Sequence, residues 1–151
     1  MNDVVRSANI SEILRGIPHR YPFLLIDRVE ACEPGKWVRV TKNVSQGDWY
    51  FRGIPFERQV MPQVLLLEAL AQAAGALCHF SSLMSDPART IVLFAGASEA
   101  RFNGDARPGD QLVLECTLVR AMRGVAKLVG TCSVDTRVIL ETKLAAAIRN
   151  V

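Results

Sequence analysis

The most constraining feature of the sequence is a long apolar segment, residues 64–80, that carries one carboxylate. Its only side chains with hydrogen-bonding or titratable groups of note are those of Glu68, Gln72, Cys78 and His79. A helix that is apolar nearly all round belongs in a core or in a membrane. Because an unpaired carboxylate is costly in such surroundings, we expect Glu68 to have a polar partner or to take part in chemistry. Gln72 follows four residues later, so both side chains are predicted to share one helix face.

The length and composition indicate a folded protein rather than a disordered chain. Half of the 151 residues are hydrophobic and 22% are charged, so a core of reasonable size is expected. We predict a single domain that covers residues 1–151. The net charge of +3 is mild and the Lys and Arg residues are scattered along the chain, so nucleic-acid binding is not expected.

Nothing in the N-terminal residues or in the cysteines points to an exported or membrane protein. The first ten residues have neither the basic region nor the apolar region of a signal peptide. The four cysteines show no C-x-x-C spacing, so we interpret them as small buried hydrophobic residues in a reducing compartment. Residues 64–80 are too few, and too interrupted by Glu68 and Gln72, to span a membrane. We predict a cytoplasmic protein.

The remainder of the chain is predicted to wrap this helix in strands. Ser11 is expected to cap a short helix that Gly16 and Pro18 end, and residues 46–61 form a long loop of the kind that is functional or disordered. Strand-like runs occupy residues 23–31, 37–44, 90–102, 111–121, 125–135 and 138–148. Two strands, a buried helix and a four-strand meander predict an α+β fold, a curved antiparallel sheet wrapped around one long central helix.

A series of short motifs resembles the 3-hydroxyacyl-[acyl-carrier-protein] dehydratases of type II fatty-acid synthesis. The motifs are P-H-R-Y-P-F-L-L-I-D-R-V from residue 18, V-M-P from 60, V-L-L-L-E-A-L-A-Q-A-A-G from 64, L-F-A-G from 93, A-R-F from 100 and P-G-D-Q-L from 108. Each is weak alone, but their order and spacing are specific, and together they cover nearly the whole chain. The resemblance implies a hotdog fold assembled as a homodimer or as a trimer of dimers.

One segment departs from the family pattern where the family has a catalytic residue. Family members carry G-H-F-P-G-x-P-V-M-P-G before the helix, whereas this chain reads G-I-P-F-E-R-Q-V-M-P-Q from residue 53. Ile54 thus occupies the position of the catalytic His, and Gln63 that of a glycine. Ile54 neither accepts nor donates a proton, and each general acid or base is worth ~10²–10⁴-fold in rate. We therefore expect dehydration by a homomer to be weak.

The resemblance assigns roles to the two polar residues of the helix. Eliminating water from a 3-hydroxyacyl thioester requires a base for the α-proton and an acid for the departing hydroxyl. In the family, a His from one subunit and a Glu from the other share this work, while N–H groups at the helix N-terminus polarise the thioester carbonyl. The resemblance makes Glu68 the catalytic Glu and Gln72 the residue that orients it. The alternative is that Gln72 holds Glu68 for assembly alone.

Three residues are candidates to replace the missing His. Glu57 is the nearest candidate base, although a solvated loop charge is the simpler interpretation. His79 shares roughly the helix face of Glu68 but lies ~16 Å further along the axis, at 1.5 Å per residue. His19 belongs to the P-H-R-Y-P-F motif, and we interpret it as making a structural hydrogen bond.

The resemblance also implies a set of substrate-binding residues. They are Tyr21, Phe23, Gly53, Ile54, Gln63, Val64, Gln72 and Phe94. Tyr21 and Phe23 are expected at the mouth of the acyl tunnel, with packing into the core as the alternative. Gln63 keeps its backbone N–H, but its side chain crowds a place where glycine permits close approach. No metal or other cofactor is implied, and the expected partner is acyl-carrier protein bearing an acyl-phosphopantetheine arm.

Three functions remain open from the sequence. The first is a dehydratase-family enzyme with altered or weak chemistry, acting on an acyl chain carried by acyl-carrier protein. The second is a hotdog acyl thioesterase in which Glu68 alone activates water, although the extended dehydratase motifs argue against it. The third is a non-catalytic subunit of a heteromeric dehydratase, in which a heterodimer with a His-bearing hotdog chain holds one complete site.

Overall fold

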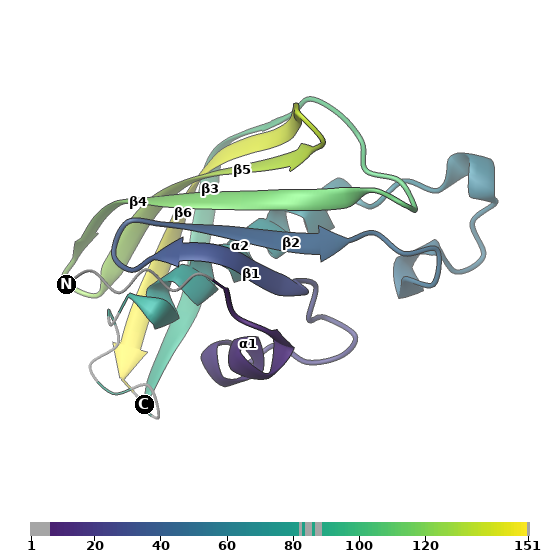
Figure 1. The fold of residues 1–151 in the computed structure, drawn as a ribbon. Helices are drawn as coiled ribbons and strands as arrows, with labels where there is room; N and C mark the ends of the chain where they lie inside the picture. The colour runs from purple at the N-terminus through teal and green to yellow at the C-terminus, as the bar shows by residue number, and fades with distance from the viewer. Residues whose placement is uncertain (1–6, 82, 84–85, 87–88, 151) are drawn as a thin grey trace.

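In the computed structural model, which describes residues 7–81, 83, 86 and 89–150, a curved sheet wraps around one long helix (Figure 1). The elements in chain order are α1 (Ile10–Gly16), β1 (Arg28–Glu33), β2 (Trp37–Asn43), η1 (Trp49–Phe51), η2 (Phe56–Arg58), α2 (Gln63–Phe80), β3 (Thr90–Phe102), β4 (Gln111–Met122), β5 (Val125–Val134) and β6 (Arg137–Asn150). The predicted α+β fold is confirmed. Residues 1–6, on which part of the signal-peptide argument depends, lie outside the described residues.

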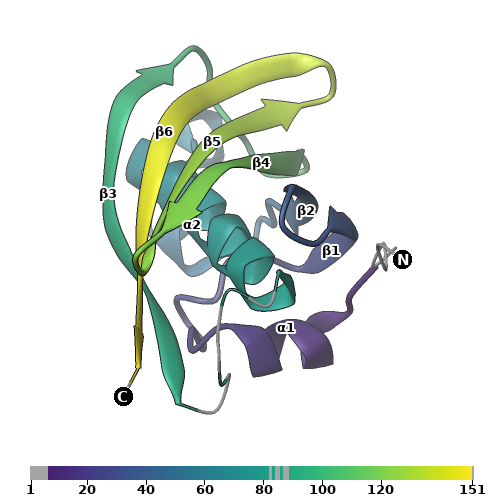
Figure 2. The same ribbon diagram turned by 90° about the vertical axis from the view of Figure 1, so that its left-hand side faces the viewer.

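Helix α2 fills the inside of the sheet's curve (Figure 2). Leu66, Leu70, Ala73 and Leu77 of α2 are fully buried, and β5 alternates buried and exposed residues along its length. Among the described residues, α2 is the only helix long and apolar enough to cross a membrane, but most of it is buried inside the protein. It is a core helix. The four cysteines are likewise buried and free, as predicted.

The strand order is β1-β2-β4-β5-β6-β3, and every neighbouring pair is antiparallel. The predicted four-strand meander is therefore wrong at one end: β4, β5 and β6 form a meander, but β3 pairs with β6 at the far edge. Residues 103–110 connect β3 to β4 and cross the end of the sheet, from the side of β6 to the side of β2. The Asn103 N–H donates to the Ile139 carbonyl at 2.8 Å, and the Gly109 N–H donates to the Val44 carbonyl at 2.8 Å.

The first strand begins later than predicted, at Arg28 instead of residue 23. The reason is that the backbone at Phe23 and Leu25 is hydrogen-bonded to a helix side chain instead of to a strand. The Leu25 N–H donates to Gln72 Oε1 at 2.9 Å, and the Phe23 carbonyl accepts from Gln72 Nε2 at 2.7 Å. Residues 23–26 thus cross α2 before the chain joins β2, where the Asp27 N–H donates to the Thr41 carbonyl at 2.9 Å.

Helix α1 ends at Gly16 as predicted, but its N-cap is Asn9 and not Ser11. Asn9 Oδ1 accepts from the Glu12 N–H at 3.2 Å, and Glu12 Oε2 accepts from the Asn9 N–H at 2.8 Å. This reciprocal capping box satisfies two N–H groups at once, whereas a lone Ser cap satisfies one. Helix α1 contacts α2 and β1.

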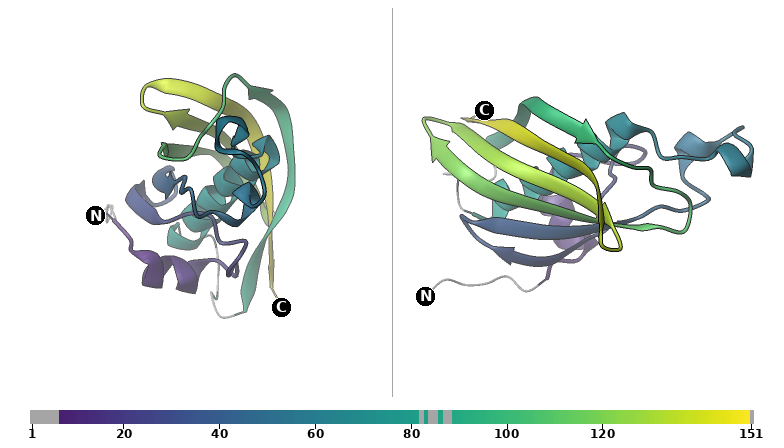
Figure 3. Two further views of the ribbon diagram at one scale, coloured as in Figure 1. Left: turned by 90° about the vertical axis from the view of Figure 1, so that its right-hand side faces the viewer. Right: turned by 90° about the horizontal axis from the view of Figure 1, so that it is seen from above.

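The loop between β2 and α2 is ordered by two short 3₁₀ helices, η1 and η2, and projects past the end of the sheet (Figure 3). Its base is held by Asp48, whose Oδ2 accepts from Lys42 Nζ at 3.2 Å and from the Ser45 N–H at 3.1 Å. Lys42 is only 5% exposed, so its ammonium needs this carboxylate. The loop turns at Gly53, whose φ of +76° favours glycine.

Candidate active site

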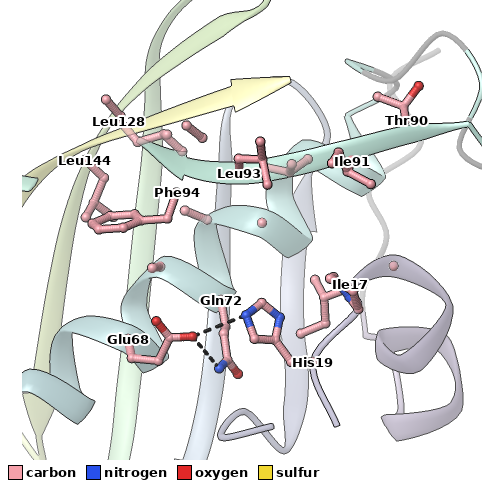
Figure 4. Close-up of a pocket in the computed structure, with 18 of the residues that line it drawn as sticks. Ile17, His19, Glu68, Gln72, Thr90, Ile91, Leu93, Phe94, Leu128 and Leu144 are labelled. Carbon is pink, nitrogen blue, oxygen red and sulfur yellow. Dashed lines mark hydrogen bonds and ion pairs between the residues drawn. The ribbon is translucent and has the colours of Figure 1, made fainter. Parts of the chain in front are cut away.

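A cavity of about 450 Å³ lies between α2 and the strands β3, β5 and β6, and is closed on one side by the end of α1 and the residues that follow it. Its volume falls in the range of small-molecule sites. Glu68 and Gln72 come from α2, and His19 comes from the segment between α1 and β1 (Figure 4). Much of the opposite wall is apolar and includes Leu93, Phe94, Leu128 and Leu144. A few polar groups thus face an apolar chamber.

Gln72 is the buried anchor of this polar group. It is 1% exposed, and its amide makes three hydrogen bonds. Its Nε2 donates to the Phe23 carbonyl at 2.7 Å and to Glu68 Oε1 at 2.8 Å, while its Oε1 accepts from the Leu25 N–H at 2.9 Å. The opposite amide orientation would place oxygen against the Phe23 carbonyl and the Glu68 carboxylate, so the orientation is determined. Gln72 therefore presents Glu68 with an N–H donor.

Glu68 is held through one carboxylate oxygen. His19 Nε2 lies 3.2 Å from Glu68 Oε1, the same atom that accepts from Gln72. Burial by itself raises the pKa of Glu68, but its contacts with His19 and Gln72 outweigh that effect, so the pKa lies below its ordinary value. The second oxygen, Oε2, has no hydrogen bond among the described residues and points toward the side of the cavity where Phe94 lies (Figure 4). The prediction that Glu68 has polar partners is confirmed.

His19 is the site residue that sequence reasoning missed. A contact with Glu68 is compatible with the structural hydrogen bond that we expected, but nothing in the spacing placed His19 in the cavity. The Arg20 guanidinium fixes this segment by donating to the carbonyls of Leu14, Ile17 and His19 at 2.8, 2.9 and 2.7 Å. The available signal was the need of Glu68 for a partner, together with the P-H-R-Y-P-F motif.

The structure brings only some of the predicted site residues to the cavity. Glu68, Gln72 and Phe94 line it. The others do not, namely Tyr21, Phe23, Gly53, Ile54, Gln63 and Val64. Tyr21 is 87% exposed, so the alternative that it packs into the core is wrong. The substrate-binding roles of these residues stay predictions.

The remaining candidate bases also lie away from the cavity. Glu57 is exposed on η2, in keeping with a solvated loop charge. The His79 ring packs against Gly16 so closely that a side-chain carbon there would meet it at 2.8 Å. Burial lowers the pKa of His79. Among the residues that the structure describes, no group of three or more His, Cys, Asp or Glu side chains is arranged to hold a metal ion.

Comparison with known proteins agrees with this geometry. The curved sheet around one buried helix is the hotdog fold, and residues 17–143 match the model of the FabA-like domain. The chain is 44% identical to the 3-hydroxyacyl-[acyl-carrier-protein] dehydratase FabZ of Burkholderia lata over 93% of this chain and 91% of that protein. It is 42% identical to the FabZ of Thiobacillus denitrificans over 94% and 98%. The chain belongs to the FabZ-type 3-hydroxyacyl-[acyl-carrier-protein] dehydratase family.

Solved structures support the fold alone, because their sequence identities are low. The dehydratase heterocomplex ApeI:P from Xenorhabdus doucetiae superimposes with a TM-score of 0.76 at 19% identity, covering 91% of each chain. A hypothetical thioesterase with coenzyme A from Streptococcus pneumoniae gives a TM-score of 0.63 at 11% identity, covering 91% of each chain.

Proposed function

We propose that this protein binds 3-hydroxyacyl thioesters carried by acyl-carrier protein and dehydrates them to 2-enoyl thioesters, with Glu68 as the proton-transfer group. The observation that carries the proposal is a carboxylate at the wall of an apolar cavity, anchored through one oxygen with the other left to meet a ligand. The family, and the names of the FabZ relatives, support the choice of reaction.

The elements around the cavity suit such a substrate. The apolar wall formed by Leu128 and Leu144 takes the acyl chain. Helix α2 begins after Pro62 with no side-chain cap, so the N–H groups of Gln63 and Val64 have no capping side chain. Neither residue lines the cavity, and their role in polarising the thioester carbonyl is proposed from the family resemblance. The net reaction removes a proton from the α-carbon and hydroxide from the β-carbon, and these combine as water.

The rate is expected to be low for this family. By the family resemblance, Ile54 occupies the position of the family's His, and a side chain without a proton donor or acceptor lowers the rate by ~10²–10⁴-fold. In the single chain, Ile54 lies on the projecting loop and does not line the cavity that contains Glu68. Turnover should therefore be slow and should depend entirely on Glu68.

We further propose that the chain works as a homodimer or as a trimer of dimers. Among the described strands, β3 pairs only with β6, so its other edge is open. Leu93 and Phe94 on β3 are 47% and 52% exposed. An open edge with apolar side chains favours pairing with another chain.

A second candidate is the non-catalytic subunit of a heteromeric dehydratase. It is favoured by the projecting loop, whose exposed Phe56 and Ile54 stand clear of the chain's own cavity. A partner hotdog chain that carries a His in the corresponding loop would then complete a site around Glu68.

The test is turnover of 3-hydroxyacyl-carrier-protein substrates of several chain lengths by the purified protein, with Glu68→Gln as the control. Formation of the 2-enoyl product that disappears in the control supports the proposal. Absence of product from folded protein that binds the acyl carrier overturns it. If activity then appears only on mixing with a His-bearing hotdog chain, the subunit role is correct. Release of the carrier thiol without enoyl product would instead identify a thioesterase.

A further inference from the structure

His19 is joined to Glu68 within one chain, although the two residues come from different segments (Figure 4). Its Nε2 lies 3.2 Å from Glu68 Oε1. Its other ring nitrogen, Nδ1, is buried without a hydrogen-bond partner among the described residues. The imidazole therefore has one polar contact, and that contact is the carboxylate that the proposed reaction uses.

The surroundings determine where the proton lies in this pair. A proton on Nδ1 would be a buried donor without an acceptor, which costs about 1–3 kcal/mol. Both the imidazolium and the neutral Nδ1–H tautomer carry that proton. The neutral tautomer with its proton on Nε2 avoids this cost and donates to Glu68 Oε1. Gln72 donates to the same oxygen, so both neighbours of Oε1 stabilise the ionised carboxylate.

We propose that His19 is a positioning residue that keeps Glu68 ionised and leaves its Oε2 free, so that Glu68 is the base of the reaction. This inference rests on the proposed dehydration. It differs from a scheme in which a His removes the α-proton and the Glu serves as the acid. It also needs no proton-transfer group at residue 54.

The elimination then balances with one carboxylate. Glu68 Oε2 takes the α-proton, the electron pair of that C–H bond forms the α–β double bond, and the bond from the β-carbon to the hydroxyl oxygen breaks. The proton on Oε2 passes to the departing oxygen and forms water, which returns Glu68 to its ionised state. His19 neither gains nor loses a proton.

Other charged groups around the cavity do not replace His19. Arg15 and Arg20 also line it. Among the described residues Arg15 forms no ion pair with Glu68, and the Arg20 guanidinium is engaged by three backbone carbonyls. Strands β3, β5 and β6 contribute no titratable side chain to the lining, and α2 contributes only Glu68. His19 and Gln72 are therefore the polar partners that set the state of Glu68 among the described residues.

The test is the side-chain carboxyl titration of Glu68, followed by NMR in substrate-free protein labelled with ¹³C-glutamate and assigned with Glu68→Gln. His19→Leu removes the donor and should shift the titration of Glu68 to higher pH. His19→Gln, whose amide can donate from nearly the same place, should restore most of the original midpoint. The acid limb of the pH profile of kcat/KM should likewise move to higher pH in His19→Leu and return most of the way in His19→Gln. Equal midpoints in wild type and His19→Leu, or equal shifts in both variants, would overturn the proposal.

A second measurement covers the case in which His19→Leu does not fold. Long-range ¹H–¹⁵N spectra of the wild-type protein report the imidazole tautomer directly. The expected result is a neutral His19 with its proton on Nε2, and an Nδ1–H tautomer would contradict the inference. Both measurements use free protein, so they can succeed even if no dehydration is observed. Failure of the proposed function can therefore be distinguished from failure of this inference.

Discussion

Gln72→Leu tests whether the buried amide holds the crossing segment onto α2. Leu has nearly the same volume but makes no hydrogen bond. The Leu25 N–H is left buried and unpaired, which lowers the free energy of unfolding by about 2 kcal/mol. Loss of the bond to the partly exposed Glu68 carboxylate lowers it by about 1 kcal/mol more. The lost bond to the Phe23 carbonyl is counted as small, because Phe23 is 43% exposed. Greater apolar burial of Leu offsets about 1 kcal/mol, so we expect a net loss of about 2 kcal/mol.

The assay for this prediction is urea unfolding followed by the fluorescence of the two tryptophans. Protein concentration is held fixed, because subunit association changes apparent stability. Glu68→Gln is the matched control, since it leaves the bonds from Gln72 to Phe23 and Leu25 in place, and it should cost less than about 1 kcal/mol. If Gln72→Leu costs less than 1 kcal/mol, or no more than the control, the argument that this amide anchors the segment is wrong.

Three further predictions, the last with its own control variant, test the site and the core. Ile54→His should raise Glu68-dependent dehydration by ~10²–10⁴-fold if a proton-transfer group is all that the loop lacks; an unchanged rate with the same carrier substrate would show that the loop itself is remodelled. The folded-state pKa of Glu68 lies below its unfolded value of about 4.3, so ionised Glu68 stabilises the protein above that pH, and the contribution is lost as the pH falls through the folded pKa. Urea unfolding of Glu68→Gln across this acid range should accordingly depend less on pH than that of wild type. Gly130→Ala would place a carbon 2.9 Å from Leu70 Cδ2 and should cost about 1–3 kcal/mol. Gly75→Ala in α2, which meets only ordinary contacts, should be neutral or stabilising by up to about 1 kcal/mol, and equal losses in thermal unfolding would contradict the packing argument.

The polar face of α2 and the class of fold could be predicted from the sequence. The spacing of Glu68 and Gln72 depends only on helix geometry, and strand alternation depends only on neighbouring residues. Both are local properties of the chain. The motifs that resemble the dehydratase family predicted the hotdog fold and the family. The relatives and the family model confirm the family.

The tertiary structure alone decided which remote segments meet. Strand β3 pairs with β6 because residues 103–110 carry the chain across the sheet, and no local pattern encodes that crossing. The same holds for His19, which reaches Glu68 only because Gln72 and Arg20 tie the segment after α1 to its place beside α2. Sequence periodicity therefore determined that a carboxylate sits on a buried helix. Hydrogen bonds between segments far apart in the sequence determined that His19 is the partner of this carboxylate.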